Sequence, residues 1–161
     1  MTDNIFDYLN WRGDLSFRQS PFNEVDGAIL AKLSYLPLER VLEQGSMEPV
    51  SIADAAKKLF SIPNIDGNFM RKEDSPLLSA LAESPRFFNM CLFNCVNRFD
   101  PESQTQFCAM TVRMSESELY VAFRGTDNTL VGWKEDFNMC FVCPVPAQKL
   151  AVEYLEGVAK S

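Results

Sequence analysis

The residues best suited to chemistry lie in one stretch, Tyr120-Val-Ala-Phe-Arg-Gly-Thr-Asp127. Its apolar residues up to Phe123 predict a buried strand, and Arg124, Gly125 and Thr126 follow where that strand ends. Glycine lets the backbone turn sharply and approach a ligand closely. The amide after the glycine and the Thr126 hydroxyl would then be neighbouring hydrogen-bond donors. Donors fixed before a reaction stabilise a developing oxyanion, which is what acyl transfer requires.

A second part of this candidate site is Gly132-Trp-Lys-Glu-Asp136. Arg124 and Asp136 are interpreted as an ion pair that braces the loop, because the guanidinium fork suits a partly buried carboxylate. Contact of Arg124 with a substrate stays open as the alternative. Trp133 is expected to pack over the sheet rather than to hold a ligand. For Thr126, the alternative is a turn residue whose hydroxyl satisfies a local amide.

Val121-Ala-Phe-Arg-Gly-Thr126, followed by Trp133-x-x-Asp136, resembles the oxyanion-loop region of class 3 lipases. With Pro21-Phe-Asn-Glu-Val-Asp26 and Leu33-Ser-Tyr-Leu36 included, the chain from about residue 3 onward is more similar to the Mbeg-like group, a bacterial α/β-hydrolase-like domain of unknown function. The resemblance implies that Thr126 is an oxyanion-hole residue, and that Asp136 holds its hydroxyl in place.

The rest of a hydrolase active site is missing from the sequence. None of the 161 residues is a histidine, and no serine has a glycine both two residues before and two residues after it. A serine hydroxyl is a weak nucleophile without an adjacent base, and a nucleophile elbow has the Gly-x-Ser-x-Gly pattern. We therefore interpret the chain as the amino-terminal part of a serine hydrolase of lipase or esterase type. The chain alone is predicted to be inactive, and the whole protein would act on esters or lipids.

The alternative interpretation is a non-catalytic binding module derived from the hydrolase fold. The absence of histidine favours it as much as it favours an incomplete enzyme. A metal site or other cofactor is not expected in either case.

The predicted fold is α/β, as in the amino-terminal portion of an α/β-hydrolase: helices, a three-strand antiparallel meander and one crossover helix. A single domain is expected over 1–161, with helices at about 21–85, the sheet at about 90–125 and the crossover helix at about 147–160. A crossover helix normally leads to a parallel strand, which does not appear before Ser161. The sheet edge is therefore expected to be unpaired and to favour self-association.

Local signals set the expected helix starts and strand faces. Asn23 and Ser51 are predicted helix caps because each has an aspartate three residues later, and Ser75-Pro76 is expected to open a helix over 77–82. The first 15 or so residues show no clear period. Alternation predicts three strand faces, formed by Cys91, Phe93 and Cys95, by Cys108, Met110, Val112 and Met114, and by Leu119, Val121 and Phe123.

Charge and composition exclude several partners. The formal net charge is -7, so nucleic acid and anionic membrane surfaces are not expected to bind. No apolar run approaches the ~18 residues of a transmembrane helix, and the amino terminus lacks the features of a signal peptide. A cytoplasmic location is therefore expected. Five cysteines, an odd number, fit a reducing compartment better than a disulfide framework.

The pair Cys140-Phe-Val-Cys143 invites a zinc or redox interpretation, with Cys91 and Cys95 as a second pair. Residues i and i+4 of a strand lie about 13 Å apart, which is too far for one tetrahedral site. Thioredoxin-like chemistry places its pair at a helix start, and Pro144 does not favour a helix directly after Cys143. The cysteines are therefore expected to be buried and to act as small hydrophobic residues.

Overall fold

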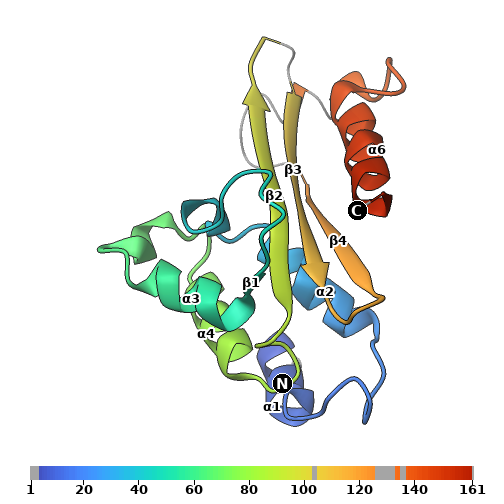
Figure 1. Cartoon of the computed structure of the whole chain (residues 1–161). Coiled ribbons are helices and arrows are strands. Elements are labelled where there is room, and N and C mark those ends of the chain that lie inside the picture. The colour runs from blue at the N-terminus through green and yellow to red at the C-terminus, as the bar shows by residue number, and fades with distance from the viewer. Residues whose placement is uncertain (1–3, 103–104, 126–132, 135–136, 161) are drawn as a thin grey trace.

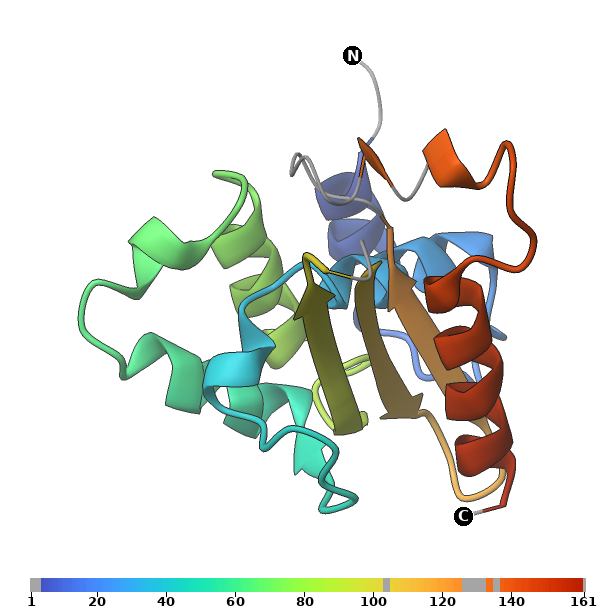
Figure 2. The ribbon, with the colours of Figure 1, turned by 90° about the horizontal axis from the view of Figure 1, so that it is seen from above.

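The computed structural model describes residues 4–102, 105–125, 133–134 and 137–160. An antiparallel four-stranded sheet with the order β1-β2-β3-β4 runs through its middle (Figure 1). Helices α1 to α4 lie on one side of this sheet, and α6 lies on the other (Figure 2). The helices are α1 Ile5–Arg12, α2 Glu24–Leu33, α3 Ile52–Phe60, α4 Asp74–Glu83 and α6 Pro146–Ala159, with short 3-10 turns at Leu38–Arg40 and Ile65–Asn68. The strands are β1 Val50–Ser51, β2 Cys91–Asp100, β3 Thr105–Arg113 and β4 Leu119–Arg124.

The predicted caps of α2 and α3 are confirmed. The Asn23 side chain accepts the backbone N–H of Val25 at 2.9 Å, and the Asp26 carboxylate accepts the N–H of Asn23 at 3.0 Å. The Ser51 hydroxyl oxygen accepts the Asp54 N–H at 3.0 Å. Each bond satisfies an amide that has no partner within the helix, so the sequence signal fixes where the helix begins.

The helical region begins earlier than the expected residue 21, because α1 forms near the amino terminus, where no apolar period was found. Helix α1 begins with the same reciprocal cap as α2: the Asn4 side chain accepts the Phe6 N–H at 2.8 Å, and Asp7 accepts the Asn4 N–H at 2.9 Å. The pattern Asn-x-x-Asp, which also marks the start of α2, is therefore the signal from which this helix could have been predicted. The third predicted helix is also longer than expected, since α4 already begins at Asp74.

The sheet differs from the prediction in two ways. It has four strands rather than three, because β1 pairs antiparallel with β2 and places Val50 opposite Leu92. The register of β2 against β3 shifts between Phe93 and Val96, where Asn94 has a left-handed φ of 49°. Because of this bulge, Cys95 joins the core together with Leu92, so the predicted face of Cys91, Phe93 and Cys95 does not form.

The two faces of the sheet carry cores of unequal size. The larger core lies under α1 to α4 and includes Met110 and Val112 of β3, as their alternation predicted. The smaller core lies under α6, where Phe107 and Ala109 pack against Tyr154. The Tyr154 hydroxyl donates to the Asn94 carbonyl at 2.7 Å, so α6 is hydrogen-bonded to the bulge of β2.

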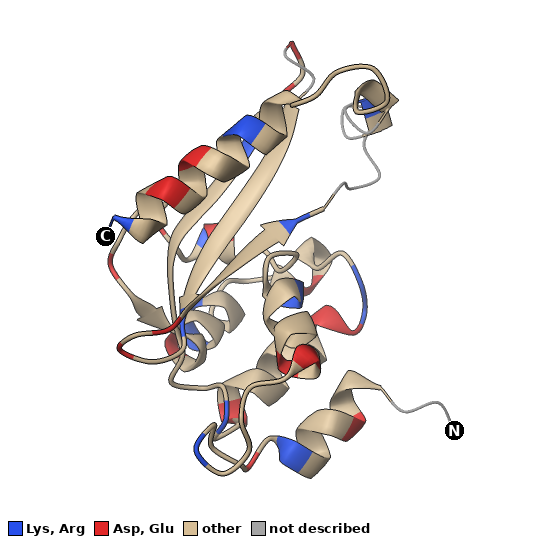
Figure 3. Cartoon of the chain, turned by 90° about the vertical axis from the view of Figure 1, so that its right-hand side faces the viewer, with Lys and Arg blue, Asp and Glu red and all other residues tan. Residues whose placement is uncertain are grey.

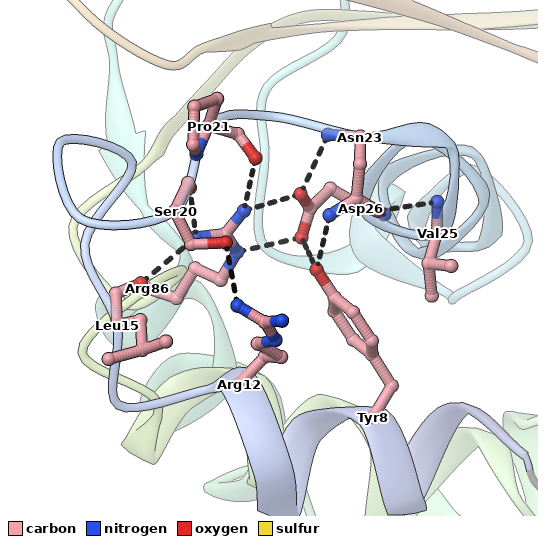
Figure 4. Close-up of polar contacts among 9 residues, drawn as sticks. All are labelled: Tyr8, Arg12, Leu15, Ser20, Pro21, Asn23, Val25, Asp26 and Arg86. Carbon is pink, nitrogen blue, oxygen red and sulfur yellow. Dashed lines mark hydrogen bonds and ion pairs between the residues drawn. The ribbon is translucent and has the colours of Figure 1, made fainter.

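A buried ion pair joins the helical layer to the start of the sheet (Figure 4). The Arg86 Nε donates to Asp26 at 2.7 Å and Nη2 donates to the other oxygen of this carboxylate. The remaining N–H groups donate to the carbonyls of Leu15, Ser20 and Pro21. All five guanidinium donors are thus used, and both charged side chains are 0% exposed.

Two aromatic side chains complete this cluster. The Tyr8 hydroxyl of α1 donates to Asp26 at 2.9 Å, and the Phe17 ring lies 4.0 Å from the Arg86 guanidinium carbon. The hydrogen bonds to Asp26 raise the pKa of Arg86 above its usual value. Because no donor is left for a ligand, we assign the cluster a structural role.

Replacing Arg86 by Met should lower the free energy of unfolding by about 3–5 kcal/mol, because the Asp26 carboxylate would stay buried without its partner. Urea denaturation measures this change. The matched control is Lys160→Ala, which removes an exposed ion pair of 3.9 Å with Glu156 and should change the stability by less than about 0.5 kcal/mol. Equal effects of the two substitutions would contradict the central role of the buried pair.

The stability of the fold should also fall in alkaline solution. Burial raises the pKa of Tyr154 from 10.0 and that of Cys95 from 9.0, each to about 12. The unfolded chain therefore loses these protons first, and the stability is fully present below about pH 9 and is lost as the pH rises toward 12. Tyr154→Phe should flatten part of this loss in urea titrations at several pH values. Phe107→Leu, which alters a neighbour of Tyr154 but removes no titrating group, should keep the slope.

Candidate functional site

The candidate site lies at the carboxyl end of β4, where Arg124 is the last strand residue. The strand register places Asn97, Cys108 and Arg124 in one row across β2, β3 and β4. Arg124 reaches along this row, and its Nη2 donates to the Asn97 side-chain oxygen at 3.0 Å. The buried Nε of Arg124 has no hydrogen-bond partner among the described residues. The strand end is thus braced from within the sheet.

The glycine that follows β4 is held by the helical layer. The Gly125 N–H donates to the Tyr35 hydroxyl at 3.0 Å. A Cβ atom at this position would lie 3.1 Å from the same oxygen, so a larger residue would crowd the contact. Near the start of β4, the Tyr120 hydroxyl donates to the Gly27 carbonyl of α2 at 2.9 Å. Helix α2 therefore holds the start of β4, and Tyr35 after α2 holds the residue that follows its end.

A hollow of about 200 Å³ lies beside this strand end, between β3, β4 and the first turns of α6. Its wall is mostly apolar and includes Phe107, Phe123, Met139, Val145, Ala147 and Ala151. Figure 3 shows charged residues along α6 and the helical layer, and a basic residue at the tip of β4, where Arg124 ends the strand. The mostly apolar wall suits an apolar group of modest size, with one positive charge beside it.

The described residues around the hollow offer little chemistry of their own. Burial raises the pKa of Cys108, and the charge of Arg124 offsets this only in part. The thiol therefore stays protonated and is a poor nucleophile near neutral pH. The guanidinium of Arg124 and the amino end of α6 both favour a negative charge nearby. Within the described part of the chain, the site can bind and orient a group but holds no activated nucleophile.

Only some of the predicted site residues lie within the part of the chain that the structure describes. Arg124 and Gly125 lie at the strand end as predicted, whereas Thr126 and Asp136 fall outside the described residues. The ion pair between Arg124 and Asp136 stays a prediction, since the described partner of Arg124 is Asn97. Trp133 is 63% exposed, which contradicts its expected packing over the sheet.

Sequence reasoning missed the residues that support the strand end. Tyr35 contacts Gly125 across 90 positions of sequence, and Asn97 reaches Arg124 across 27. Tyr35 belongs to the Leu33-Ser-Tyr-Leu36 segment used for the family resemblance, but nothing in its spacing indicated a partner. Such contacts arise only when helix and strand are packed together.

The expected burial of the cysteines is correct only for Cys95 and Cys108. Cys91 is half-buried at the start of β2, and Cys140 and Cys143 are exposed before α6. The residues around the last pair form an open turn rather than a strand or core helix, which is why the hydrophobic interpretation fails there. Among the residues that the structure describes, no three Cys, Asp or Glu side chains are grouped to hold a metal ion.

The fold and site define a protein with mixed helices and an antiparallel four-stranded sheet, of the α/β class, with an apolar hollow at the carboxyl end of one strand. A family model described as Mbeg1-like matches residues 81–161, and the chain belongs to this family. The match contains β2, β3, β4 and α6, and therefore the whole wall of the hollow.

The other comparisons add no relative. No curated protein and no solved structure matches the chain. The predicted Mbeg-like resemblance is thus confirmed at the level of the family, while the relationship to class 3 lipases and the bacterial origin stay predictions. None of the described helices is long and apolar enough to span a membrane. The cytoplasmic location stays a prediction.

Replacing Tyr35 by Phe should speed amide hydrogen exchange at Gly125, because the N–H loses its acceptor. The cost in stability should be about 0.5–1.5 kcal/mol, and near the lower value because Gly125 is exposed to water. The matched control is Tyr120→Phe, which removes the bond to Gly27 instead and should leave exchange at Gly125 unchanged. Unaltered exchange at Gly125 in the Tyr35 variant would rule out this contact.

Proposed function

We propose that this chain supplies the oxyanion-loop part of a serine hydrolase that acts on esters or lipids. The observation that carries the proposal is the apolar hollow of about 200 Å³ at the end of β4, directly before Thr126. An ester needs such a place for its acyl group beside the donors that stabilise its oxyanion. We assign those donors to Thr126, the residue that follows Gly125 in the sequence.

The support of the strand end fits this role. An oxyanion hole is effective when its donors are held in place before the reaction. Gly125 is held by Tyr35 and Arg124 is held by Asn97, so the residues directly before Thr126 are anchored by the helical layer and by the neighbouring strand β2. The Gly125 N–H is occupied by Tyr35, so we assign the donors to the Thr126 amide and hydroxyl. Asp136 would orient that hydroxyl, and Arg124 would support the loop.

The nucleophile and the base would be encoded after Ser161. This part of the proposal rests on the absence of histidine from the chain and on the lack of a serine in an elbow pattern. A following strand could pair with β4, which is an edge strand of the described sheet. An elbow at the end of that strand would lie at the same edge of the sheet as the end of β4.

The first experiment reads the coding sequence after Ser161 and expresses the chain with that continuation. We expect hydrolysis of p-nitrophenyl esters and labelling by a fluorophosphonate, which reacts with activated serines. Thr126→Val should lower kcat by about 10²–10³ with little change in KM, because the lost donor acts mainly in the transition state.

The control is Thr126→Ser, which keeps the hydroxyl and should retain most of the activity. Circular dichroism and thermal unfolding confirm that both variants fold. A continuation that carries an elbow but gives neither labelling nor ester hydrolysis would refute the enzymatic proposal. Equal activity of the Val and Ser variants would refute only the role of the Thr126 hydroxyl and would leave the enzymatic proposal standing.

A second candidate function is a non-catalytic binding module. Exposed apolar residues after the oxyanion loop favour it: Trp133, Phe137, Met139, Phe141 and Val142 are each between 46% and 75% exposed. Such a surface is typical of interaction sites. Within the described part of the chain β4 is an edge strand, and this edge is a further place where a second copy could bind. A stop codon directly after Ser161 would select this function over hydrolysis.

A further inference from the structure

Cys140 and Cys143 are the sequence motif that the proposed function leaves without a role. We propose that these two thiols form a reversible intramolecular disulfide on the rim of the hollow, by exchange with a small-molecule disulfide of the glutathione type. This modification concerns the described residues themselves and does not depend on the proposed hydrolysis.

Exposure selects this pair among the five cysteines. Cys140 and Cys143 are exposed free thiols, so an external disulfide can reach both. Cys95 and Cys108 are only 7% and 6% exposed, and burial raises the pKa of each. The thiolate is the attacking species, so these two react slowly. Cys91 is half-buried and directs its thiol to the Asn89 carbonyl at 3.6 Å.

The chain between the two cysteines is short and exposed. A helical turn precedes Cys143, with Val142 N–H donating to the Asn138 carbonyl at 2.8 Å and Cys140 N–H donating to the Phe137 carbonyl at 3.1 Å. Cys140 lies on this turn and Cys143 follows it, with Phe141 and Val142 between them. A disulfide needs Cβ atoms about 3.5–4.5 Å apart, so closure requires the exposed segment from Cys140 to Cys143 to bend.

Gln148 holds the two ends of this segment together. Its side-chain oxygen accepts the Val145 N–H at 2.9 Å, and its amide nitrogen lies 3.9 Å from the Met139 sulfur as a weak donor. Met139 and Val145 flank the cysteines and both line the hollow. The segment is thus already looped, so the disulfide closes a short ring at little cost in chain entropy. Its formation would fix the rim of the hollow covalently.

The exchange balances without any further reactant. One protein thiolate attacks a sulfur of the external disulfide, which releases one small thiolate and leaves a mixed disulfide. The second protein thiol gives its proton to solvent and displaces the second small thiolate, which takes up a proton. Two protein S–H bonds and one external S–S bond become one protein S–S bond and two external S–H bonds. The protein is oxidised and the small disulfide is reduced.

The test is a redox titration of the folded chain in mixtures of reduced and oxidised glutathione, followed by acid quench, unfolding, alkylation and mass spectrometry. Trypsin separates the cysteines, because Cys140 and Cys143 fall in peptide 135–149, Cys91 and Cys95 in 87–98, and Cys108 in 99–113. We expect peptide 135–149 to lose both alkylation sites and two hydrogen atoms. In the folded chain this should occur at a several-fold lower ratio of oxidised to reduced glutathione than in the chain unfolded in urea. The other two peptides should stay fully alkylated.

A matched variant separates the intramolecular bond from simple thiol capping. Cys143→Ser should leave Cys140 with one bound glutathione and no internal disulfide, whereas Cys91→Ser should titrate like the parent chain. The proposal is overturned if peptide 135–149 keeps both alkyl groups or carries two glutathiones across the titration. It is equally overturned if the Cys91 and Cys95 peptide oxidises at the same ratio.

Discussion

The fold depends on the buried ion pair between Arg86 and Asp26. A guanidinium enclosed without water has to satisfy all its N–H groups, and Arg86 does so with one carboxylate and the carbonyls between α1 and α2. These carbonyls can meet one guanidinium only if the connecting loop wraps around it. The pair therefore sets the path of that loop, and it fixes α2 against the start of β2. A buried ion pair of this kind specifies an arrangement more than it adds stability, since desolvation cancels much of its attraction.

The candidate site follows from the same arrangement by two further contacts. Helix α2 is fixed by Asp26, it contacts β4 through Gly27 and Tyr120, and Tyr35 after its end holds Gly125. The residues before the predicted oxyanion loop are thus positioned from the helical face of the sheet. The hollow forms on the other face, where the core under α6 is smaller and Phe123 of β4 is 38% exposed. One face of the sheet therefore holds the strand end, and the other leaves room for a ligand.

The segment between the loop and α6 combines properties that a structural connection does not need. It exposes large apolar side chains and two thiols, and it also borders the hollow through Met139 and Val145. Apolar exposure favours binding to another molecule, and the thiol pair gives this same region sensitivity to the redox state of its surroundings. Both properties act on the rim of one hollow, so binding there and thiol oxidation would influence each other.

The sequence alone determined the features that depend on neighbouring residues. Helix starts at Asn23 and Ser51 and the strand end at Arg124 and Gly125 follow from local capping and periodicity. The buried strand expected up to Phe123 is wrong, because Leu119 and Phe123 are 42% and 38% exposed. The sequence also contained the cap at Asn4, which the lack of an apolar period obscured. Tertiary structure decided the rest. The two residues of β1 are too short to show a period, and the bulge at Asn94 moves Cys95 onto the other face. The contacts of Tyr35, Asn97 and Arg86 join residues far apart in sequence. Cys95 is buried and Cys140 is exposed because other elements pack over the first and not over the second. Such choices are made by packing, which no local pattern encodes.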